Sequence, residues 1–548
     1  MVNSDRHFNS DRRNLLKGIV AGTAAGMIPG IAGAATEAGP KMLSKGVTPA
    51  SFSRAVGELR AIVGAEWVFA DTESVLPYTI ANDPDPGHLH EPIGAVAPAS
   101  TEEVQQIIKV ANKYKLPVWP VSTGKNIGYG TTLTATPGQM ILDLKRMNRI
   151  IEVDAELGTA LIEPGVTYPQ LSDYLIENKI PLWIDCPSPG PITGPVGNSL
   201  ERGGGYTPYG DHFSAISGME VVLPDGQVIR TGFGVANSKV WQAFKYGWGP
   251  YIDGLFSQSN FGVVTKMGLC LMAAPPATRT FMVRLNKESD IANFVTTTRD
   301  LQLHGVIQQE VFALSPLYEL AQHHRRDEIW DQPGPIPDDV VMKKAKEEGL
   351  SAWNCYFSLY GTEQVFALFE PMVRAAYGAI GGEVFSDAEM KGNRYFDHQA
   401  TLMRGGLTLE EKGIIRWRGE GGLSWFCPFG PAKGQDAVEM IALAKQILTK
   451  YGFDYTAGLP VIARAVGQVV AILFDKGNPE EEKRAAQCND ELIVEFCKRG
   501  YLPYRTGVRT MALVAQQLFD KSRADFNHRI KHAIDPNGIL APGKSGIL

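Results

Sequence analysis

The stretch that indicates the fold is PVSTGKNIGYG, residues 120–130. Its three glycines and its adjacent serine and threonine follow an apolar run, residues 116–121, that we expect to form a short strand. Glycine permits close approach and unusual φ angles, so such a loop can turn its backbone N–H groups towards a pyrophosphate. The spacing fits neither a Walker loop nor the G-x-G-x-x-G fingerprint, and taken alone the loop is also compatible with a simple tight turn.

Two further glycine-rich segments lie downstream of this loop. GPVGN at 194–198 precedes GGGYTPYGDH at 203–212, and SQSNFGVVT occupies 257–265. Several separated loops that converge on one elongated ligand are what an extended dinucleotide requires. The segments together therefore favour a dinucleotide site over isolated turns.

The elements around these loops predict an α+β fold with short strands. A capping box at residues 100–103 starts a helix that we expect to end near Tyr114. After residues 275–276, a Pro-Pro pair, glycine becomes rarer and a second unit begins, which ends with a long charged helix over 479–499. Glycine and proline are again frequent in the rest of the chain. We therefore expect an N-terminal domain that the C-terminal segment completes, with a cap inserted between them.

The chain resembles the vanillyl-alcohol oxidase / p-cresol methylhydroxylase (PCMH) family of FAD flavoproteins. The resemblance is carried by PVSTGKNIGYG, GPVGNSLERGGGYTPYGDHF, GMEVVLPDGQVIRTG, YIDGLFSQSNFGVVTKMG and DPNGILAPGKSGI. It implies an α+β fold with a PCMH-type FAD-binding domain of two α+β subdomains at 35–275. A substrate or cap domain with a large antiparallel sheet covered by helices would follow at 276–500. Residues 501–548 would complete the FAD-binding and active-site region.

By the same resemblance, FAD is held by the glycine-rich segments and by one lysine near the C-terminus. The implied cofactor-binding residues are Ser122, Thr123, Gly124, Lys125, Asn126, Ile127, Gly128, Gly130, Pro195, Gly197, Asn198, Gly205, Tyr206, Gly262, Val264 and Lys544. Lys544 would hold negative charge on the reduced flavin near N1, or would be a solvated lysine of the tail. Tyr206 and Glu201 either line the site or are structural.

In this family the oxidation of a para-substituted phenol uses three groups that bind the phenol oxygen. Their positions match Tyr129, and Tyr504 with Arg505. Hydride loss from the benzylic carbon is easy only when the ring oxygen supplies electrons as a phenolate, and two phenol donors and a guanidinium stabilise that oxyanion. The implied product is a p-quinone methide, to whose side-chain carbon water adds.

Covalent flavin attachment in this family uses a tyrosine or a histidine near the junction of the cap and the FAD domain. The tyrosine position of the methylhydroxylases holds Ile415 here, and the histidine position of the oxidases holds Leu423. Neither side chain is a nucleophile, so we predict that FAD is bound non-covalently.

The group that activates water also departs from the family pattern. The aspartate position of the oxidases holds Ser188, as in the methylhydroxylases, and the compensating glutamate position holds Gly458. Asp185 and Glu411 are the nearby candidates. Small residues at 458 and 460 indicate room for a 4-alkylphenol bulkier than cresol, such as eugenol, 4-propylguaiacol or a lignan like pinoresinol.

The N-terminal residues indicate an export signal. Arg12 and Arg13 precede an uncharged segment rich in alanine and glycine, which ends in the cleavage pattern Ala-Gly-Ala at 32–34. The adjacent arginines favour a twin-arginine signal over residues 1–34, and an ordinary secretory signal or a membrane anchor is the alternative. We therefore expect a periplasmic protein with no membrane association after cleavage, and the family implies a homodimer.

Composition argues against several classes of partner and cofactor. The chain of 548 residues has a formal net charge of −6 and no block rich in lysine and arginine, which argues against a nucleic-acid partner. Its six cysteines and ten histidines show no metal-ligand spacing and no C-x-x-C-H haem motif. We expect no metal site, and a cytochrome would be a separate chain.

The leading functional hypothesis is a dehydrogenase that acts on a phenolic small molecule and passes electrons to a cytochrome c or to a small azurin-like copper protein. The export signal and the Ser188 match favour it. The alternatives are an oxidase that reduces O₂ to H₂O₂ and, more remotely, a non-catalytic flavin-fold binding protein.

Overall fold

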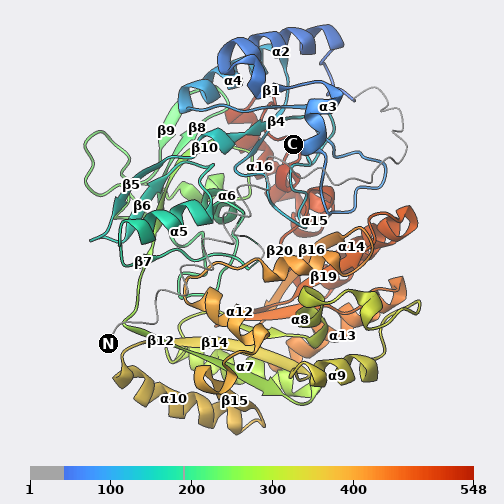
Figure 1. The fold of residues 1–548 in the computed structure, drawn as a ribbon. Helices are drawn as coiled ribbons and strands as arrows, with labels where there is room; N and C mark the ends of the chain where they lie inside the picture. The colour runs from blue at the N-terminus through green and yellow to red at the C-terminus, as the bar shows by residue number, and fades with distance from the viewer. Residues whose placement is uncertain (1–41, 189, 191) are drawn as a thin grey trace. The chain divides into compact units, whose positions relative to one another are not determined.

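The computed structural model describes residues 42–188, 190 and 192–548. The twin-arginine signal predicted for residues 1–34 therefore lies outside the described residues. Figure 1 shows the described chain with its helices and strands labelled. Within these residues, no helix is both long enough and apolar enough to cross a membrane.

A small sheet carries the glycine-rich loop at residues 120–130. Its strand order is β1-β2-β4-β3, and β2, β4 and β3 run parallel. Its strands are β1 Val68–Phe69, β2 Gly94–Val96, β3 Val118–Val121 and β4 Met140–Asp143. The helices of this region are α2 Pro49–Val63, α3 Thr72–Val75 and α4 Thr101–Tyr114. Because β3 ends at Val121, the loop lies at the carboxyl end of a parallel strand, where open sheets bind ligands.

Helix α4 is confirmed where the capping box predicts it. Ser100 caps the helix, because its hydroxyl accepts a hydrogen bond from the backbone N–H of Glu103 at 3.2 Å. Val104 and Ile107, on the apolar face of α4, are fully buried in a core shared with β2, β3 and β4. This packing fixes the sheet from which the loop projects.

A second sheet carries the other glycine-rich segments. It is antiparallel, with the order β5-β6-β10-β8-β9. Its strands are β5 Ile150–Asp154, β6 Thr159–Ile162, β8 Ile216–Val222, β9 Val228–Arg230 and β10 Val263–Cys270. The flanking elements are α5 Tyr168–Glu177, α6 Pro195–Leu200 and the short pair β7 Leu182–Trp183 with β11 Met272–Ala273.

The largest sheet has nine strands, all paired antiparallel. Its main order is β15-β12-β14-β13-β17-β18-β16-β19, and β20 pairs with β16. The strands are β12 Ala277–Leu285, β13 Val311–Leu314, β14 Trp353–Gly361, β15 Glu383–Ser386, β16 Gly422–Pro431, β17 Ala457–Ile462, β18 Ala465–Gly467, β19 Val469–Phe474 and β20 Leu502–Arg505. The helices around it are α7 Ile291–Leu303, α8 Pro316–His323, α9 Asp338–Glu347, α10 Glu363–Gly378, α11 Asp387–Met390, α12 Arg394–Met403, α13 Gly434–Tyr451 and α14 Pro479–Lys498.

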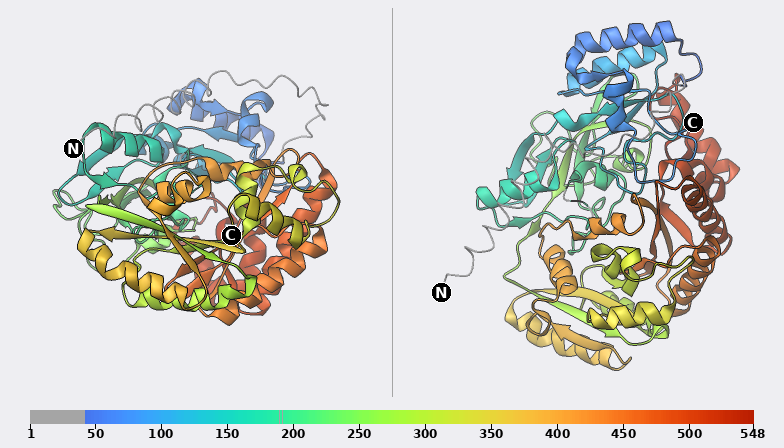
Figure 2. Two further views of the ribbon diagram at one scale, coloured as in Figure 1. Left: turned by 60° about the horizontal axis from the view of Figure 1, so that its bottom comes forward. Right: turned by 45° about the vertical axis from the view of Figure 1, so that its right-hand side comes forward.

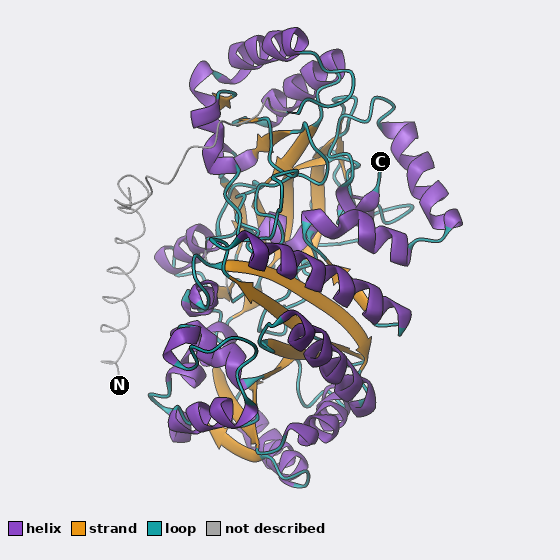
Figure 3. Ribbon diagram, turned by 90° about the vertical axis from the view of Figure 1, so that its right-hand side faces the viewer, coloured by secondary structure: helices purple, strands orange, loops and turns teal. Residues whose placement is uncertain are grey.

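The two faces of this sheet have different surroundings. Helices α7, α10, α13 and α14 cover one face and form a large apolar core with it (Figure 3). Strand residues of the opposite face pack with Tyr129 and Tyr206, which come from the glycine-rich segments. This opposite face therefore borders the candidate site. The sheets and their covering helices confirm the predicted α+β fold with a helix-covered antiparallel cap.

The C-terminal segment contacts both the large sheet and the small one. Strand β20 pairs with β16, and α15 Met511–Leu518 and α16 Lys521–Ile534 follow it. Leu540 then forms a parallel bridge with Val118 of β3, so the end of the chain returns to the small sheet (Figure 2). One segment of the chain thus brings a cap strand and a lysine-bearing tail to the same region.

Candidate active site

Two adjoining cavities lie between the glycine-rich segments and the face of the large sheet that helices α7, α10, α13 and α14 do not cover. The first is lined by the glycine-rich segments and by the C-terminal tail. The second has a volume of about 480 Å³ and is lined by strands of the large sheet and by residues 202–211. The walls that the two cavities share are formed by Lys125, Asn126, Tyr129, Thr193, Asn198 and Arg505. A ligand held in the first cavity can therefore present its end to the second.

The first cavity contains most of the residues predicted to bind a cofactor. Those that line it are Ser122, Thr123, Gly124, Lys125, Asn126, Gly197, Asn198, Gly262, Val264 and Lys544. Among the described residues, the backbone N–H groups of residues 123–126 donate no hydrogen bond. Thr131 Oγ1 and Asn260 Oδ1, on the same wall, are buried and also lack a partner. Buried polar groups are costly when unpaired, so this lining fits an extended polar cofactor such as FAD.

Six of the predicted cofactor residues do not line this first cavity. Ile127 and Tyr206 line the second cavity, whereas Gly128, Gly130, Pro195 and Gly205 line neither. Gly128 and Gly205 are required by close packing instead. A methyl group at Gly128 would lie 2.3 Å from Trp425 Cδ1, and one at Gly205 would lie 1.3 Å from Asp185 Oδ1.

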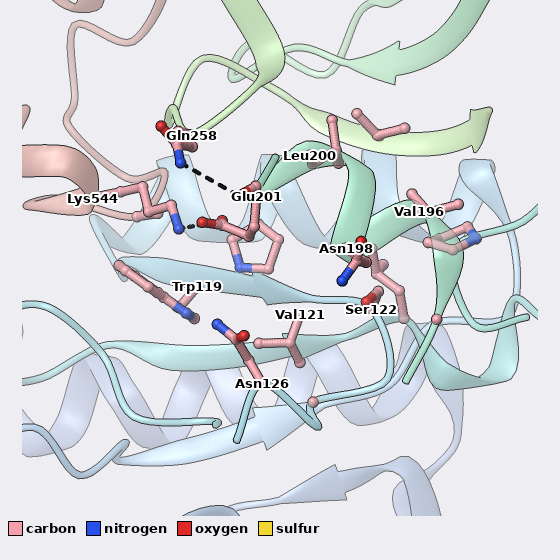
Figure 4. A pocket seen from close by; sticks show the side chains of 18 of the residues that line it. Trp119, Val121, Ser122, Asn126, Val196, Asn198, Leu200, Glu201, Gln258 and Lys544 are labelled. Atoms are coloured by element: carbon pink, nitrogen blue, oxygen red, sulfur yellow. Dashed lines mark hydrogen bonds and ion pairs between the residues drawn. The ribbon is translucent and has the colours of Figure 1, made fainter. Parts of the chain in front are cut away.

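Lys544 reaches the first cavity from the C-terminal tail and forms an ion pair with Glu201 (Figure 4). Its ammonium group also lies 5.6 Å from the centre of the Trp119 ring. Burial opposes ionisation of Glu201, but Lys544 and Arg505 outweigh it and lower the pKa of this carboxyl. Lys544 is therefore a largely buried cation beside the cavity, rather than a solvated tail residue.

The floor of the second cavity is formed by two paired strands of the large sheet. Phe312 and Leu314 of β13 face the cavity, and Pro460 and Gly458 of β17 lie opposite them in the register. Side chains in a strand alternate between its faces, so every second residue here contributes to the floor. The absence of a side chain at Gly458 leaves space at the end of this floor.

Tyr129, Tyr504 and Arg505 all line the second cavity, as the sequence predicts for groups that bind one oxygen. The Arg505 guanidinium lies 4.0 Å from the centre of the Tyr129 ring, and its Nη2 donates a hydrogen bond to Asn126 Oδ1. Arg505 Nε is buried and has no partner. The Tyr129 hydroxyl lies 3.1 Å from Cys427 Sγ. The site therefore offers an unpaired donor and a positive charge next to two phenol groups.

The two tyrosines remain protonated in this environment. Burial, followed by the neighbouring Cys427 and Tyr504, raises the pKa of Tyr129 well above its usual value, against the opposing effect of Arg505. Burial likewise raises the pKa of Tyr504. Both hydroxyls thus stay hydrogen-bond donors at neutral pH, and Arg505 supplies the charge. This combination is suited to the stabilisation of an oxyanion.

Glu411 places a carboxyl group in the second cavity. The Tyr318 hydroxyl donates a hydrogen bond to Glu411 Oε1 at 2.8 Å, while Oε2 is buried without a partner in hydrogen-bonding geometry. Burial raises the pKa of Glu411, although Ser188, Tyr318 and Tyr206 favour its charged form. Ser188 also lines the cavity, and its hydroxyl lies 3.2 Å from His398 Nε2. Glu411 can therefore accept a proton from a molecule in this cavity.

Asp185, the other acidic candidate, has a structural position. It accepts hydrogen bonds from the backbone N–H groups of Tyr206 and Thr207, and it pairs with His212 Nε2 at 2.8 Å. Asp185 lines neither cavity. Of the two candidates, only Glu411 is placed where a ligand could contact it.

Ile415 and Leu423, the positions predicted to lack a flavin link, also line neither cavity. Leu423 begins the contact between β16 and the N-terminal part of the chain, because its N–H donates to the carbonyl of Asn82 at 2.9 Å. Two residues later the N–H of Trp425 donates to the carbonyl of Gly128 at 3.2 Å. Strand β16 thereby fixes the loop that carries Tyr129.

Sequence reasoning missed several residues of the second cavity. Glu310, Phe312 and Trp425 line it, yet none belongs to a motif quoted above. Their positions depend on strand pairing, for which a single sequence carries only a weak alternating signal. Within the described residues, no group of three or more histidine, cysteine, aspartate or glutamate side chains could hold a metal ion.

The fold and the site together define a flavoprotein oxidoreductase. A family profile described as an FAD binding domain matches residues 92–232, which include the first two glycine-rich segments. The residues that would hold FAD are those that line the first cavity.

Comparison with known proteins identifies the family. The chain is 42% identical over 509 residues to the 4-cresol dehydrogenase [hydroxylating] flavoprotein subunit of Pseudomonas putida, an alignment that covers 92% of this chain and 98% of that protein. A crystal structure of p-cresol methylhydroxylase with substrate bound matches with a TM-score of 0.90 and 42% identity, covering 92% of this chain and 98% of that one. The 4-ethylphenol oxidase of Gulosibacter chungangensis, in an isoeugenol complex, matches with a TM-score of 0.90 and 32% identity, covering 92% and 99%. The chain belongs to the vanillyl-alcohol oxidase / p-cresol methylhydroxylase family and is a 4-cresol dehydrogenase-like FAD oxidoreductase.

Proposed function

We propose that this enzyme oxidises a 4-alkylphenol at the side-chain carbon next to the ring and that water then adds to that carbon. The observation that carries the proposal is that Tyr129, Tyr504 and Arg505 all line the second cavity, of which Tyr129 and Arg505 also line the first, while Arg505 Nε is buried without a partner among the described residues. The relatives named above act on cresol and ethylphenol, which are 4-alkylphenols.

The chain's own residues would act mainly on the phenol oxygen. FAD, when bound, supplies the two-electron acceptor. Tyr129 and Tyr504 donate hydrogen bonds to the oxygen, and Arg505 balances its negative charge, so the phenolate form of the substrate is favoured. A phenolate pushes electron density towards the para position and so weakens the benzylic C–H bond. The oxidised substrate is a p-quinone methide, which is electrophilic at the side-chain carbon.

We assign the activation of water to Glu411. Glu411 lines the cavity, the Tyr318 hydroxyl holds its Oε1, and its Oε2 has no hydrogen-bond partner among the described residues, so the group is oriented and can still accept a proton. The water oxygen would bond the side-chain carbon while Glu411 takes the proton. Ser188 and Tyr206 lie beside this carboxyl and favour its ionised form.

The floor of the cavity supports a substrate larger than cresol. Gly458 contributes no side chain and Pro460 only a compact ring at the place where β17 lines the cavity. We therefore propose a bulkier 4-alkylphenol, of the size of eugenol, 4-propylguaiacol or a lignan such as pinoresinol. Turnover of p-cresol in preference to every larger phenol would contradict this assignment.

The remaining parts of the proposal concern the cofactor link, the electron acceptor and the compartment. Because Ile415 and Leu423 are not nucleophiles, we propose non-covalent FAD, and acid precipitation should leave a colourless pellet and a yellow supernatant. We propose a periplasmic homodimer that passes electrons to a cytochrome c or an azurin-like copper protein, on the basis of the N-terminal signal and Ser188. The second candidate, an oxidase, is supported by the similarity to the 4-ethylphenol oxidase.

The test is an anaerobic titration of the purified holoenzyme with a series of 4-alkylphenols that ends with a bulky lignan. Bleaching of the flavin absorbance by one of them would support electron transfer from the phenol and would rank substrates by size. Absence of bleaching with every phenol would overturn the proposal. Reduction of cytochrome c without formation of peroxide would then separate the dehydrogenase from the oxidase.

A further inference from the structure

Glu310 is a carboxyl group in the second cavity that the proposed reaction has not used. It directly precedes β13 and lines the cavity together with Phe312 and Leu314, the alternate residues along the same run. Ile462 of β17 lines the same end of the floor. Glu310 and Gly458 are therefore at opposite ends of the β13–β17 pair.

The Glu310 carboxyl is close to the backbone of the glycine-rich stretch at 203–212 and, among the described residues, is not bonded to any other side chain. Among the described residues it makes no hydrogen bond and no ion pair, and a methyl group at Gly204 would lie 3.6 Å from its Oε2. Gly204 pairs with Asp211 in an isolated bridge. Asp211 lines the same cavity and is exposed to solvent, whereas Glu310 is half-buried. Glu310 thus lies between the interior of the cavity and an exposed carboxylate.

Tyr206 connects Glu310 to the interior. The Tyr206 ring stacks on Phe312, with ring centres 4.6 Å apart, so it covers the floor between the two ends of the cavity. Burial raises the pKa of Tyr206, and Glu411 and Glu310 both add to this effect. Tyr206 lines the second cavity together with both carboxyl groups. Glu411, Tyr206, Glu310 and Asp211 all line this one cavity, from the buried Glu411 to the exposed Asp211.

The surroundings of Glu310 suit a group that exchanges protons near neutral pH. Burial raises its pKa to about 8, and the neighbouring Asp185 and Asp211 add to the shift. The cationic side chains on the cavity wall are Lys125, Arg202 and Arg505. A group whose pKa is close to the working pH can both accept and release a proton without a large free-energy cost.

We propose that Glu310 carries the proton lost by the attacking water out of the cavity to solvent. The inference rests on the proposed function. The water O–H bond breaks, its oxygen bonds the side-chain carbon of the quinone methide, and the exocyclic electron pair returns to the ring oxygen. The proton passes to Glu411, then by way of Tyr206 to Glu310, and leaves at the side of Asp211. Glu310 is a positioning residue for this proton and contacts no reacting carbon.

The test follows two signals in one anaerobic turnover of the holoenzyme with 4-ethylphenol. Flavin bleaching reports oxidation of the phenol, and the non-phenolic pH indicator neutral red reports the proton that reaches solvent. In the Glu310→Gln variant we expect bleaching within about twofold of the wild-type rate and proton release slower by about 10-fold or more. The wild-type rate of proton release should also change with pH around 8, and the variant should lose that dependence.

The matched control is Glu319→Gln. Glu319 is also buried, and burial raises its pKa to about 8 as well, but it accepts a hydrogen bond from Tyr356 and lines neither cavity. This control should release its proton at the wild-type rate. A second variant, Glu310→Asp, keeps a carboxyl group and should recover proton release in part, which separates loss of the carboxyl from local misfolding.

The outcomes distinguish this inference from the proposed function. If the wild-type flavin bleaches and Glu310→Gln releases its proton as fast as wild type, the inference is wrong and the proposed function stands. Equal slowing in Glu319→Gln also overturns the inference, because the effect would then be general. If no 4-alkylphenol bleaches the wild-type flavin, the proposed function and this inference fail together.

Discussion

Arg505 is one of the residues that line both the first and the second cavity. Its position is fixed by the pairing of β20 with β16, where it lies opposite Cys427, and by the hydrogen bond to Asn126. Neighbouring Tyr129, Tyr504 and Glu201 keep its pKa above the usual value in spite of burial. One guanidinium can therefore contact the loop and still offer Nε to a ligand.

Replacing Arg505 with lysine should separate charge from geometry. Arg505→Lys keeps a positive charge but loses the planar set of donors that reaches two partners at once. We expect the rate of anaerobic flavin reduction by a 4-alkylphenol to fall by about 10²-fold, the cost of removing one preorganised oxyanion donor. Stopped-flow absorbance at saturating phenol measures this rate.

Arg509→Lys is the matched control for this prediction. Arg509 lies four residues further on, forms a two-point ion pair with Asp490 at 3.1 and 2.7 Å, and lines neither cavity. Its substitution should leave the reduction rate unchanged within about twofold, since it touches no substrate or cofactor residue. Equal losses in both variants would mean that the Arg505 effect reflects general destabilisation.

At the scale of elements, the glycine-rich loop at 120–130 is held by the cap strand β16. Gly128 has a φ of +77° and lies against Trp425, whose backbone N–H donates to the Gly128 carbonyl. A side chain at Gly128 would overlap the Trp425 indole. Packing between the loop and the strand therefore requires glycine at this position.

Gly128→Ala and Gly452→Ala form a matched pair for this packing. Both glycines have a φ of +77°, but a methyl group at Gly452, which ends α13, meets no atom within 4 Å. Gly452→Ala should lower the free energy of unfolding by about 1 kcal/mol through backbone strain alone. Gly128→Ala adds overlap with the indole and should cost about 2–4 kcal/mol in total. Denaturant unfolding followed by tryptophan fluorescence measures both, and equal losses would contradict the role of Trp425.

The sequence could predict those parts of the site that local motifs carry. The α+β fold and helix α4 follow from patterns whose residues are close in the chain. The convergence of Tyr129 with Tyr504 and Arg505, which are far apart in the chain, is implied by the resemblance to the family. The packing of Gly128 against Trp425 could not be predicted, because nothing in the sequence indicates Trp425, 297 residues away. Glu310 could not be found for a similar reason, since its place on the cavity floor depends on the register between β13 and β17. Long-range strand pairing has no reliable signal in one sequence.

At the scale of the whole described molecule, Asp83 connects the N-terminal part to the cap. Its Oδ2 accepts a hydrogen bond from the backbone N–H of Gly130 at 2.7 Å, next to Tyr129 in the loop. Its carbonyl accepts from Lys476, which follows β19 of the cap, at 2.6 Å. Burial raises the pKa of Asp83 to about 7, although Gly130, Lys476 and Arg509 favour the charged form. The contact between loop and cap is therefore sensitive to pH within the neutral range.

The direction of this sensitivity follows from the raised pKa. A carboxyl that holds its proton more tightly in the folded state stabilises the fold fully below its unfolded pKa, near 4, and loses that contribution as the pH rises through about 7. Asp83→Asn keeps an oxygen acceptor for Gly130 but cannot ionise. We expect its thermal midpoint to equal or fall below that of wild type at pH 5 and to exceed it by about 1–3 °C at pH 8. Asp225→Asn is the control: Asp225 lies in an exposed turn and, among the described residues, its side chain bonds only to Gln227, so this variant should give the same difference at both pH values. A constant offset between Asp83→Asn and wild type from pH 5 to pH 8 would show that Asp83 does not carry the pH dependence of this contact.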